Sequence, residues 1–469
     1  MRSTKAKNSV PRLPKLPLRL TDPVFSAAVV LLIACAAAGG ASRLHEMRLA
    51  LVELAALPLL ALAVMRLFSN GVPEQHRLVL SVLAAVAALP LLQLIPLPPG
   101  LWDSLPGRAP LAEALDLAGI TPAWSAMSLT PDKTWRSFLA LVPPAAMLFG
   151  VLASRPEQHL ALLKFMLAVV VASVLLGAVQ IASGDRQFYL WATTDAGNFA
   201  GLLANRNHHA TLCLMALPFV AVLGGQALRR GEAGQLSVWL WGVFGLLLVI
   251  TLAIIRSRAG IILLAPVSLA SLTAAWFATG RAVPKTALIG GMAILAVAML
   301  AVILFGLDPL MDRFDTSGQR EGRFENWPYV LEAANTYLPL GSGLGSFDAV
   351  FRSVEPLDRL DSSFFNQSHN DYLESWLEAG WFAAAILGGF LVWFVRRTWT
   401  AWRSQSSARH LQRASSIAIL AVLAHSAADY PLRTALIACV FALCVAVLET
   451  ASSLSQEENT ADRPARRRR

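Results

Sequence analysis

Residues 366–381, NQSHNDYLESWLEAGW, gather side chains that suit proton transfer. Ser368 followed three residues later by Asp371 has the spacing of a capping box, which predicts a helix that begins at His369. A histidine in the first turn feels the positive end of the helix dipole, which disfavours the protonated imidazole. A neutral imidazole is a candidate general base. His369 is therefore a candidate catalytic residue, although a structural histidine at a membrane interface fits the same pattern.

The predicted helix would order the neighbouring side chains into two rows. Glu378 needs a buried partner, so we expect a structural hydrogen bond for its carboxylate. The aromatic residues Tyr372 and Trp376 fit either a supporting role at the site or the aromatic belt of a membrane interface. One row holds His369, Tyr372, Trp376 and Gly380, and the next holds Asn370, Glu374 and Glu378.

Arginine clusters elsewhere in the chain suit an anionic ligand, because a guanidinium presents a planar, permanently charged set of donors to phosphate oxygens. Alternatively, each arginine pairs with a nearby aspartate and serves only as scaffolding. The clusters are Arg256 and Arg258 in IIRSRAG, Arg320 and Arg323 in GQREGRFENW, and Arg206 in FAGLLANRNHHA, where Asn205, Asn207, His208 and His209 accompany it.

Weaker motifs carry less information. GSGLGSF at 341–347 has the glycines of a phosphate loop but follows a proline, so we expect a flexible turn. His208 and His209 are adjacent and should diverge on a helix, which argues against a shared metal ion. Asp429 and Arg433 in DYPLR most simply brace each other.

The elements that would position these residues belong to a membrane protein. Of the 469 residues, 56% are hydrophobic and only 15% are charged, and the mean hydropathy is +0.55. This composition excludes an ordinary soluble domain. Apolar runs close to the roughly 20 residues that span a bilayer predict an all-α polytopic fold with about twelve transmembrane helices. The runs are 24–41, 49–65, 78–96, 137–153, 165–182, 210–226, 236–255, 259–280, 286–306, 380–395, 414–428 and 434–448.

The distribution of basic residues predicts the orientation. Most of the 39 Lys and Arg fall in the N-terminal segment, in alternate connections and in the RPARRRR tail, so both termini are expected on the cytoplasmic side. The formal charge of +9 is then mainly a topology signal. Anionic membrane lipids are a simpler partner for the tail than nucleic acid, which we do not expect to bind.

The predicted organisation has five parts, and the long extracytoplasmic segment is its largest polar connection. We see no internal repeat of the kind common in secondary transporters. The four cysteines fall in or beside apolar runs and are expected to be core residues. The parts are a basic N-terminus at 1–23, nine transmembrane helices over 24–306, a long loop at 307–369, three more helices over 370–450, and a basic tail at 451–469.

Several motifs together resemble the bacterial O-antigen ligase and surface-polysaccharide polymerase family. His369 and Asn370 precede Gly380 by the spacing of that family's signature. The other matching stretches are RSRAG at 256–260, GRFENWPYVLEAANTYLPLGSGLGSF at 322–347 and NRNHHATLCLMALP at 205–218. Each motif is weak alone, but their order along nearly the whole chain is specific.

The resemblance implies an integral membrane glycosyltransferase of the C-type architectural class. It implies transfer of a glycan from undecaprenyl pyrophosphate to an acceptor hydroxyl with inversion, without a metal ion, cofactor or nucleotide sugar. Carried over to this sequence, His369 is the base, and Arg258 and Arg323, assisted by Arg256, hold the pyrophosphate. Asn370, Tyr372, Glu378, Asn205 and Asn207 are candidate supporting residues.

The resemblance leaves the acceptor open. The ligase signature carries a second glycine where this chain has Ala383, whereas PLPPGLWDSLPG and DYPLR look more like exopolysaccharide polymerases. We therefore favour polymerisation of lipid-linked repeat units over ligation to lipid A core, with export or chain-length-control proteins as possible partners. A flippase or a noncatalytic scaffold is the alternative from another class, although the arginines, histidines and asparagines concentrate on one outer face rather than at mid-membrane.

Overall fold

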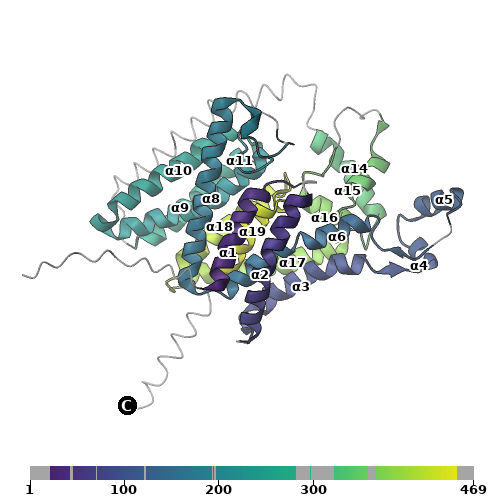
Figure 1. Cartoon of the computed structure of the whole chain (residues 1–469), viewed down its shortest axis with the longest axis horizontal. Coiled ribbons are helices and arrows are strands. Elements are labelled where there is room, and N and C mark those ends of the chain that lie inside the picture. Colours follow the sequence, from purple (N-terminus) through teal and green to yellow (C-terminus); the bar gives the residue numbers. More distant parts are fainter. Residues whose placement is uncertain are drawn as a thin grey trace, which may run out of the picture.

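The computed structural model describes residues 22–42, 46–69, 71–120, 123–192, 194, 197–280, 296, 322–357 and 365–450. In this part of the chain nearly all regular structure is helical. The exception is a two-stranded antiparallel sheet, in which β1 (Pro96–Leu97) pairs with β2 (Ser125–Ala126). The prediction of an all-α membrane fold is confirmed at this level (Figure 1).

The helices follow the apolar runs of the sequence, and several have proline within their first turn, where its missing N–H costs no hydrogen bond. They are α1 (Pro23–Ala38), α2 (Glu46–Ser69), α3 (Arg77–Gln93), α4 (Pro99–Asp103), α5 (Ala109–Leu117), α6 (Pro131–Leu139), α7 (Val142–Leu152), α8 (Pro156–Ser183), α9 (Arg206–Arg229), α10 (Gln235–Ile255), α11 (Arg258–Thr279), α14 (Gly322–Thr336), α15 (Phe347–Val354), α16 (Asp371–Ala379), α17 (Trp381–Arg403), α18 (Arg409–His425) and α19 (Ala435–Glu449). Short 3-10 turns include η1 (Glu74–His76), η2 (Arg186–Phe188), η3 (Gly231–Gly234) and η5 (Pro431–Arg433).

Eight helical segments among the described residues are long and apolar enough to cross a membrane. Helices α1 and α19 are apolar but shorter, and α18 contains the first part of the expected run at 414–428 and ends at His425. The expected span at 286–306 lies outside the described residues, apart from position 296. A multi-pass membrane protein is therefore established, whereas the count of twelve spans stays a prediction.

The proposed division into five parts also stays a prediction. The tails 1–21 and 451–469 and two stretches of the long loop, 307–321 and 358–364, lie outside the described residues. The second part of that loop contains helices, as the pattern ENWPYVLEAANTYL predicts, because α14 and α15 both lie within it.

Helix α9 lies at the centre of the main bundle. Its most apolar window is 78% buried, whereas the windows of the other seven candidate spans are 11–44% buried. It packs against α10, α11 and α18. Its N-terminal part meets the C-terminal end of α18, where the Thr211 hydroxyl lies 2.9 Å from Nδ1 of His425. Helices α9 and α18 therefore run antiparallel, so that each end of one lies beside an end of the other.

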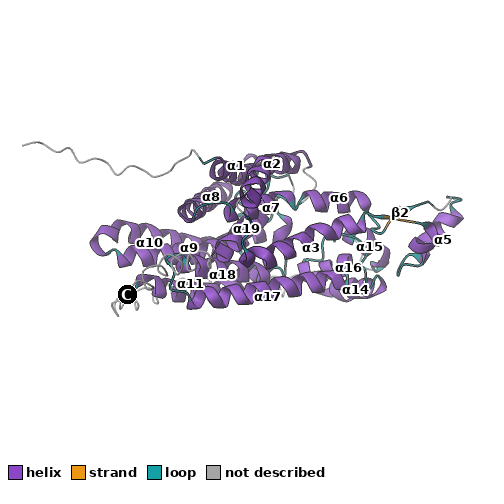
Figure 2. Cartoon of the chain, turned by 90° about the horizontal axis from the view of Figure 1, so that it is seen from below, coloured by secondary structure: helices purple, strands orange, loops and turns teal. Residues whose placement is uncertain are grey.

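A second, smaller core lies between α14, α15 and α16, which gather at one side of the molecule (Figures 1 and 2). Its buried residues include Val330, Phe347, Phe351 and Leu377. Since α14 and α15 precede the His-Asn motif and α16 follows it directly, this small core connects the long loop to the motif.

The GSGLGSF segment folds around the C-terminal end of α16. Backbone N–H groups of Gly345 and Phe347 donate to Oε1 of Glu378, at 2.9 and 3.2 Å, and Gly343 donates to the Glu378 carbonyl. Gly343 has φ +109° and touches Ser128 so closely that a Cβ would lie 2.1 Å from its hydroxyl. The expected flexible turn is instead a buried, hydrogen-bonded support for α16.

The four cysteines are free and buried, as the sequence predicts, and the sulfurs of Cys35 and Cys439 lie 3.5 Å apart. At the far end of α19, buried Glu449 accepts hydrogen bonds from Trp393 and Arg397 and contacts His76. This buried ionic group ties α19 to α17 and η1.

Candidate functional site

The helix of the His-Asn motif begins two residues later than the capping-box pattern predicts. Helix α16 begins at Asp371, and the Oδ1 atom of Asn370 accepts hydrogen bonds from Tyr372 N and Leu373 N, both at 3.1 Å. Asparagine is a strong N-cap because its side chain replaces a missing helical acceptor. The prediction that His369 starts the helix is wrong, and the helix-dipole argument built on it loses its geometric basis.

His369 instead occupies the residue before the cap, with a left-handed backbone at φ +51°. Residues other than glycine rarely adopt this conformation, and they persist there only when the surroundings fix them. The surroundings do so here from both sides. Trp327 Nε1 donates to the Ser368 carbonyl at 2.8 Å, and Asp371 N donates to the Ser426 carbonyl at 2.9 Å.

The fixed backbone aims the His369 imidazole at Asp429, in the turn that follows α18. Nδ1 of His369 lies 3.4 Å from Oδ1 of Asp429. The carboxylate is buried, with 1% exposure, and the histidine side chain is 15% exposed. The rings of Tyr430 and Phe365 flank the imidazole at centroid distances of 4.9 and 5.8 Å. The imidazole is thus oriented by a buried anion and remains partly exposed.

Asp429 also connects the motif to the start of α9. Its Oδ2 accepts a hydrogen bond from Asn207 Nδ2 at 2.7 Å, and its Oδ1 accepts one from Tyr430 N at 3.0 Å. His208 Nε2 lies 3.8 Å from Oδ1, and its Nδ1 lies 2.8 Å from the Thr434 hydroxyl. One buried carboxylate thus meets two histidines from distant parts of the sequence.

The start of α9 is itself fixed by a cap. Asn205 is the N-cap, and its side chain accepts from Asn207 N at 2.8 Å. His209 turns away from the site as expected and contacts the Ser173 hydroxyl at 3.1 Å. Of the two supporting asparagines, Asn207 reaches the site through Asp429, whereas Asn205 holds the helix that presents it.

Arg433 and three carboxyl groups of α16 form a buried ionic cluster next to the motif. Arg433 Nη2 lies 2.8 Å from Glu374 Oε1 and 3.2 Å from Glu378 Oε2, and Arg433 Nε lies 3.7 Å from Asp371 Oδ1. The expected brace between Arg433 and Asp429 is replaced, because Arg433 binds the acids of α16 and Asp429 contacts His369. Glu378 has the structural hydrogen bonds that were expected for it.

Two of the acids in this cluster, Glu374 and Asp371, resist ionisation. Burial raises the pKa of Glu374 to about 8 and that of Asp371 to about 7, and in both cases Arg433 partly opposes the shift. Burial would lower the pKa of Arg433, but attraction to Glu374, Glu378 and Asp371 outweighs it, so the guanidinium stays charged. Three carboxyl groups around one cation cannot all be charged without repulsion.

Tyr372 links the motif to α18. Its hydroxyl donates to the Leu423 carbonyl at 2.6 Å, so it ties α16 to the helix that precedes Asp429. Ser368 N and its hydroxyl both contact Glu374 Oε2, at 2.9 and 3.1 Å. These contacts hold Tyr372 against α18 and Ser368 against Glu374 of α16.

The structure describes the surroundings of the three candidate arginines less fully than those of His369. Arg256 is exposed and ends α10 with a left-handed backbone at φ +53°, and Arg258 begins α11 after the cap Ser257. Two residues later, Gly260 packs so tightly on α9 that a Cβ would lie 2.9 Å from that of Ala210. Arg258 therefore starts its helix beside the first turns of α9, which carry Asn207. Arg323 lies in the first turn of α14, and its side chain is outside the described part of the chain.

The segment that holds the arginines and the histidine matches a known family. The family model described as O-antigen ligase matches residues 243–388. This segment is therefore similar to the O-antigen ligase family. The match includes Arg256, Arg258, Arg323 and His369 and ends before Asp429. A search of curated proteins finds no match to the chain.

The O-antigen ligase family implies a membrane glycosyltransferase of the ligase or polymerase type, with a lipid-linked glycan as donor and an acceptor in the membrane. The family resemblance expected from the motifs is thereby confirmed. The sequence alone did not identify Asp429 and Arg433 as partners of the motif. The DYPLR stretch contained both residues, but only the fold shows which groups they meet.

Proposed function

We propose that this protein transfers a glycan from undecaprenyl pyrophosphate to an acceptor hydroxyl at the periplasmic face of the bacterial inner membrane. The observation that carries the proposal is the pair formed by His369 and buried Asp429, because His369 lies inside the segment that matches the O-antigen ligase family. A histidine oriented by a carboxylate is the arrangement that general-base catalysis requires.

In the proposed reaction His369 deprotonates the acceptor. Nδ1–H donates to Asp429, which leaves the lone pair of Nε2 to accept the proton of the acceptor hydroxyl. The acceptor oxygen then attacks the anomeric carbon of the donor, and the bond from that carbon to the pyrophosphate oxygen breaks. The electron pair of this bond leaves with undecaprenyl pyrophosphate, and attack from the opposite face inverts the anomeric configuration.

Asp429 stabilises the imidazolium that forms in this step. Since Asn207 and the backbone N–H of Tyr430 hold the carboxylate, it does not need to reorganise as the proton arrives. His208 Nε2 lies 3.8 Å from the same carboxylate, and its Nδ1 lies 2.8 Å from the Thr434 hydroxyl. The His208 imidazole therefore fills space next to Asp429. We assign Asp429 and Asn207 as positioning residues.

The arginines are proposed to hold the pyrophosphate. Arg258 and Arg323 would bind its oxygens as charge develops on the leaving group, and Arg256 would assist from the exposed turn between α10 and α11. The packing of Gly260 against Ala210 supports this role for Arg258, because it brings the start of α11 next to the helix that carries Asn207. The proposed reaction uses neither a metal ion nor a nucleotide sugar.

We favour polymerisation of lipid-linked repeat units as the physiological reaction. The PLPPGLWDSLPG loop and the DYPLR turn resemble exopolysaccharide polymerases, and Ala383 replaces the second glycine of the ligase signature. Ligation of the glycan to lipid A core is the second candidate, favoured by the description of the matching family as O-antigen ligase. A polymerase of this kind would work beside export or chain-length-control proteins.

The experiment that tests the proposal uses purified protein in lipid. It receives labelled undecaprenyl-pyrophosphate repeat unit from the same organism and no other acceptor, and the products are separated on a gel beside those of His369→Ala. A ladder that disappears in the variant supports a polymerase with His369 as its base.

The other outcomes separate the alternatives. A product that forms only after lipid A core is added indicates a ligase. A ladder that persists unchanged in His369→Ala contradicts the catalytic assignment. Movement of the lipid-linked glycan across the membrane of a proteoliposome, without a new glycosidic bond, indicates a flippase.

A further inference from the structure

A basic cavity lies at the opposite end of α9 and α18 from His369. It has a volume of about 400 Å³ and is lined by Gln226, Arg229, Arg230, Ser407, Arg409 and His410. Helix α9 carries Asn207 at one end and Arg229 at the other, and its 24 residues span about 36 Å at 1.5 Å per residue. Since this length is close to the thickness of a bilayer, the cavity and His369 lie near opposite membrane faces.

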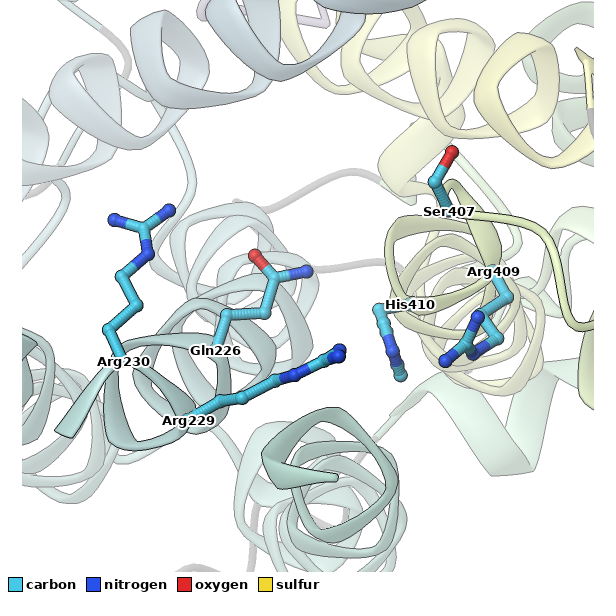
Figure 3. A pocket seen from close by; sticks show the side chains of 6 residues that line it. All are labelled: Gln226, Arg229, Arg230, Ser407, Arg409 and His410. Carbon is cyan, nitrogen blue, oxygen red and sulfur yellow. The ribbon is translucent and has the colours of Figure 1, made fainter. Parts of the chain in front are cut away.

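The charge of the cavity is uncompensated within the described part of the chain. None of Arg229, Arg230 and Arg409 pairs there with a carboxylate. Arg409 instead donates to the Gln405 and Ser406 carbonyls, at 2.6 and 2.9 Å, which fix its guanidinium beside the cavity. Figure 3 shows Arg229 extending across the cavity toward His410, with Arg409 on the other side of the ring. Converging guanidinium groups are suited to an anion.

His410 supplies an independent observation. It is only 4% exposed, yet neither of its ring nitrogens has a hydrogen-bond partner among the residues that the structure describes. A buried polar group without a partner is costly, and it indicates a ligand when it lines a cavity. Burial and the nearby charges of Arg409, Arg413 and Arg229 lower the pKa of His410 to about 4. The neutral ring can therefore donate one hydrogen bond to a bound oxygen.

The helix geometry favours the same kind of ligand. Helix α18 begins at Arg409, and its N-cap, Ala408, makes no side-chain hydrogen bond to the first turn, where Arg409 N and Leu411 N donate to the Ser406 and Ala408 carbonyls at 3.3 and 3.1 Å. The N-terminus of a 17-residue helix attracts anions, and phosphate oxygens in particular. Further along α18, buried Arg413 lies over the rings of Phe277 and Trp402 and donates to the Trp402 carbonyl, and its charge acts on His410.

We propose that this cavity is a binding site for a phosphate group, held between Arg229 and Arg409 with His410 at its base. The site is separate from the proposed glycosyl transfer and does not depend on it. A phosphate there comes either from the headgroup of an anionic phospholipid, since the cavity lies at a helix end level with the headgroups, or from a soluble phosphate.

The test measures binding to the purified full-length protein in a nonionic detergent at constant ionic strength. One arm adds a short-chain phosphatidylglycerol, compared with phosphatidylcholine of the same chain length, and the other adds inorganic phosphate, compared with chloride. Native mass spectrometry counts bound lipid, and tryptophan fluorescence follows the thermal unfolding midpoint. The double variant Arg229→Gln/Arg409→Gln is compared with Arg396→Gln, which removes an exposed arginine of α17 that does not line the cavity.

We expect the double variant to lose at least about tenfold in affinity, because two charge-assisted contacts disappear, while Arg396→Gln binds as the wild type does. If the double variant loses binding of phosphatidylglycerol alone, the natural ligand is a lipid headgroup. If it loses binding of inorganic phosphate, the ligand is a soluble phosphate. Either result supports the site. Gln226→Glu is a second variant that places a carboxylate in the cavity, and it should also prevent binding. Absence of binding to the wild type in both arms, or unchanged affinity in the cavity variants, overturns the proposal.

Discussion

Nδ1 of His369 lies 3.4 Å from Oδ1 of Asp429, although 60 residues separate them in the sequence. The contact joins the residue before α16 to the turn after α18. Two further donors, Asn207 and the backbone of Tyr430, hold the carboxylate in place. The imidazole is consequently oriented by three separate parts of the chain.

Replacing Asp429 by asparagine should lower kcat of glycosyl transfer by about 10²–10⁴-fold, with little change in KM. Asparagine keeps the shape of the side chain but cannot stabilise the imidazolium by its charge. Initial rates with the lipid-linked donor provide the measurement. Asp348→Asn is the matched control, since Asp348 lies on α15 and pairs with Lys133 and Arg352. Equal rates for wild type and Asp429→Asn would contradict the positioning role.

Arg258→Ala and Arg323→Ala should each reduce transfer by about 10²–10³-fold, which is the effect of removing one donor to a developing negative charge. Expression and elution as a monodisperse species should be unchanged. Arg352→Ala is the control, because Arg352 lies on α15 and pairs with Asp348 at 2.8 Å. Full activity of both arginine variants would remove the pyrophosphate assignment.

Glu374→Gln should weaken the pH dependence of stability between about pH 4.5 and pH 8. The ordinary pKa of 4.5 rises to about 8 in the folded protein, so over this range the folded state retains a proton that the unfolded state releases. The free energy of unfolding therefore falls as pH rises, by up to about 1.4 kcal/mol per pH unit for one proton. Glutamine cannot release that proton, so the slope should decrease.

The measurement for Glu374 is the thermal unfolding midpoint across this pH range for wild type and Glu374→Gln. Glu332→Gln, at an exposed position of α14, should reproduce the wild-type slope. Identical slopes for all three proteins would show that Glu374 ionises normally in the folded state.

Gly380→Ala should strongly reduce folding and yield. Gly380 ends α16 at φ +54°, and a Cβ there would lie 2.2 Å from the Pro339 carbonyl oxygen. The left-handed φ and the close contact with the Pro339 backbone should together lower the free energy of unfolding by roughly 2–4 kcal/mol. On α17, a methyl group added at Gly388 would meet no other atom within 4 Å, so Gly388→Ala should preserve or slightly raise stability. The yield and unfolding midpoint of the two variants decide the comparison.

The proposed orientation predicts opposite labelling of two exposed positions. Gln187→Cys, in η2 before α9, should react with a membrane-impermeant maleimide in cells with a permeable outer membrane. Ser407→Cys, beside the basic cavity, should react only after the inner membrane is opened. The four native cysteines are buried and should give little background. The reverse pattern would place the site on the cytoplasmic side.

Some features of the site followed from local sequence. The IIRSRAG turn separates α10 from α11, between the expected runs at 236–255 and 259–280, whereas the N-cap roles of Asn205 and Asn370 were not predicted. The capping-box pattern still misplaced the helix start, because Ser368 and Asn370 compete for the same helix end. Asn370 takes the cap, while Ser368 is drawn into contacts with Glu374 and Trp327.

The sequence by itself determined the membrane class, most of the helical segments and the family, because apolar runs and short ordered motifs are local properties. Tertiary structure decided which charged groups meet. Arg433 pairs with the acids of α16, and Asp429 pairs with His369, because the turn between α18 and α19 lies against the start of α16. It also decided that Arg229 and Arg409 share one cavity, since only the antiparallel packing of α9 and α18 brings their ends together. Contacts between distant segments depend on packing, which no local pattern encodes.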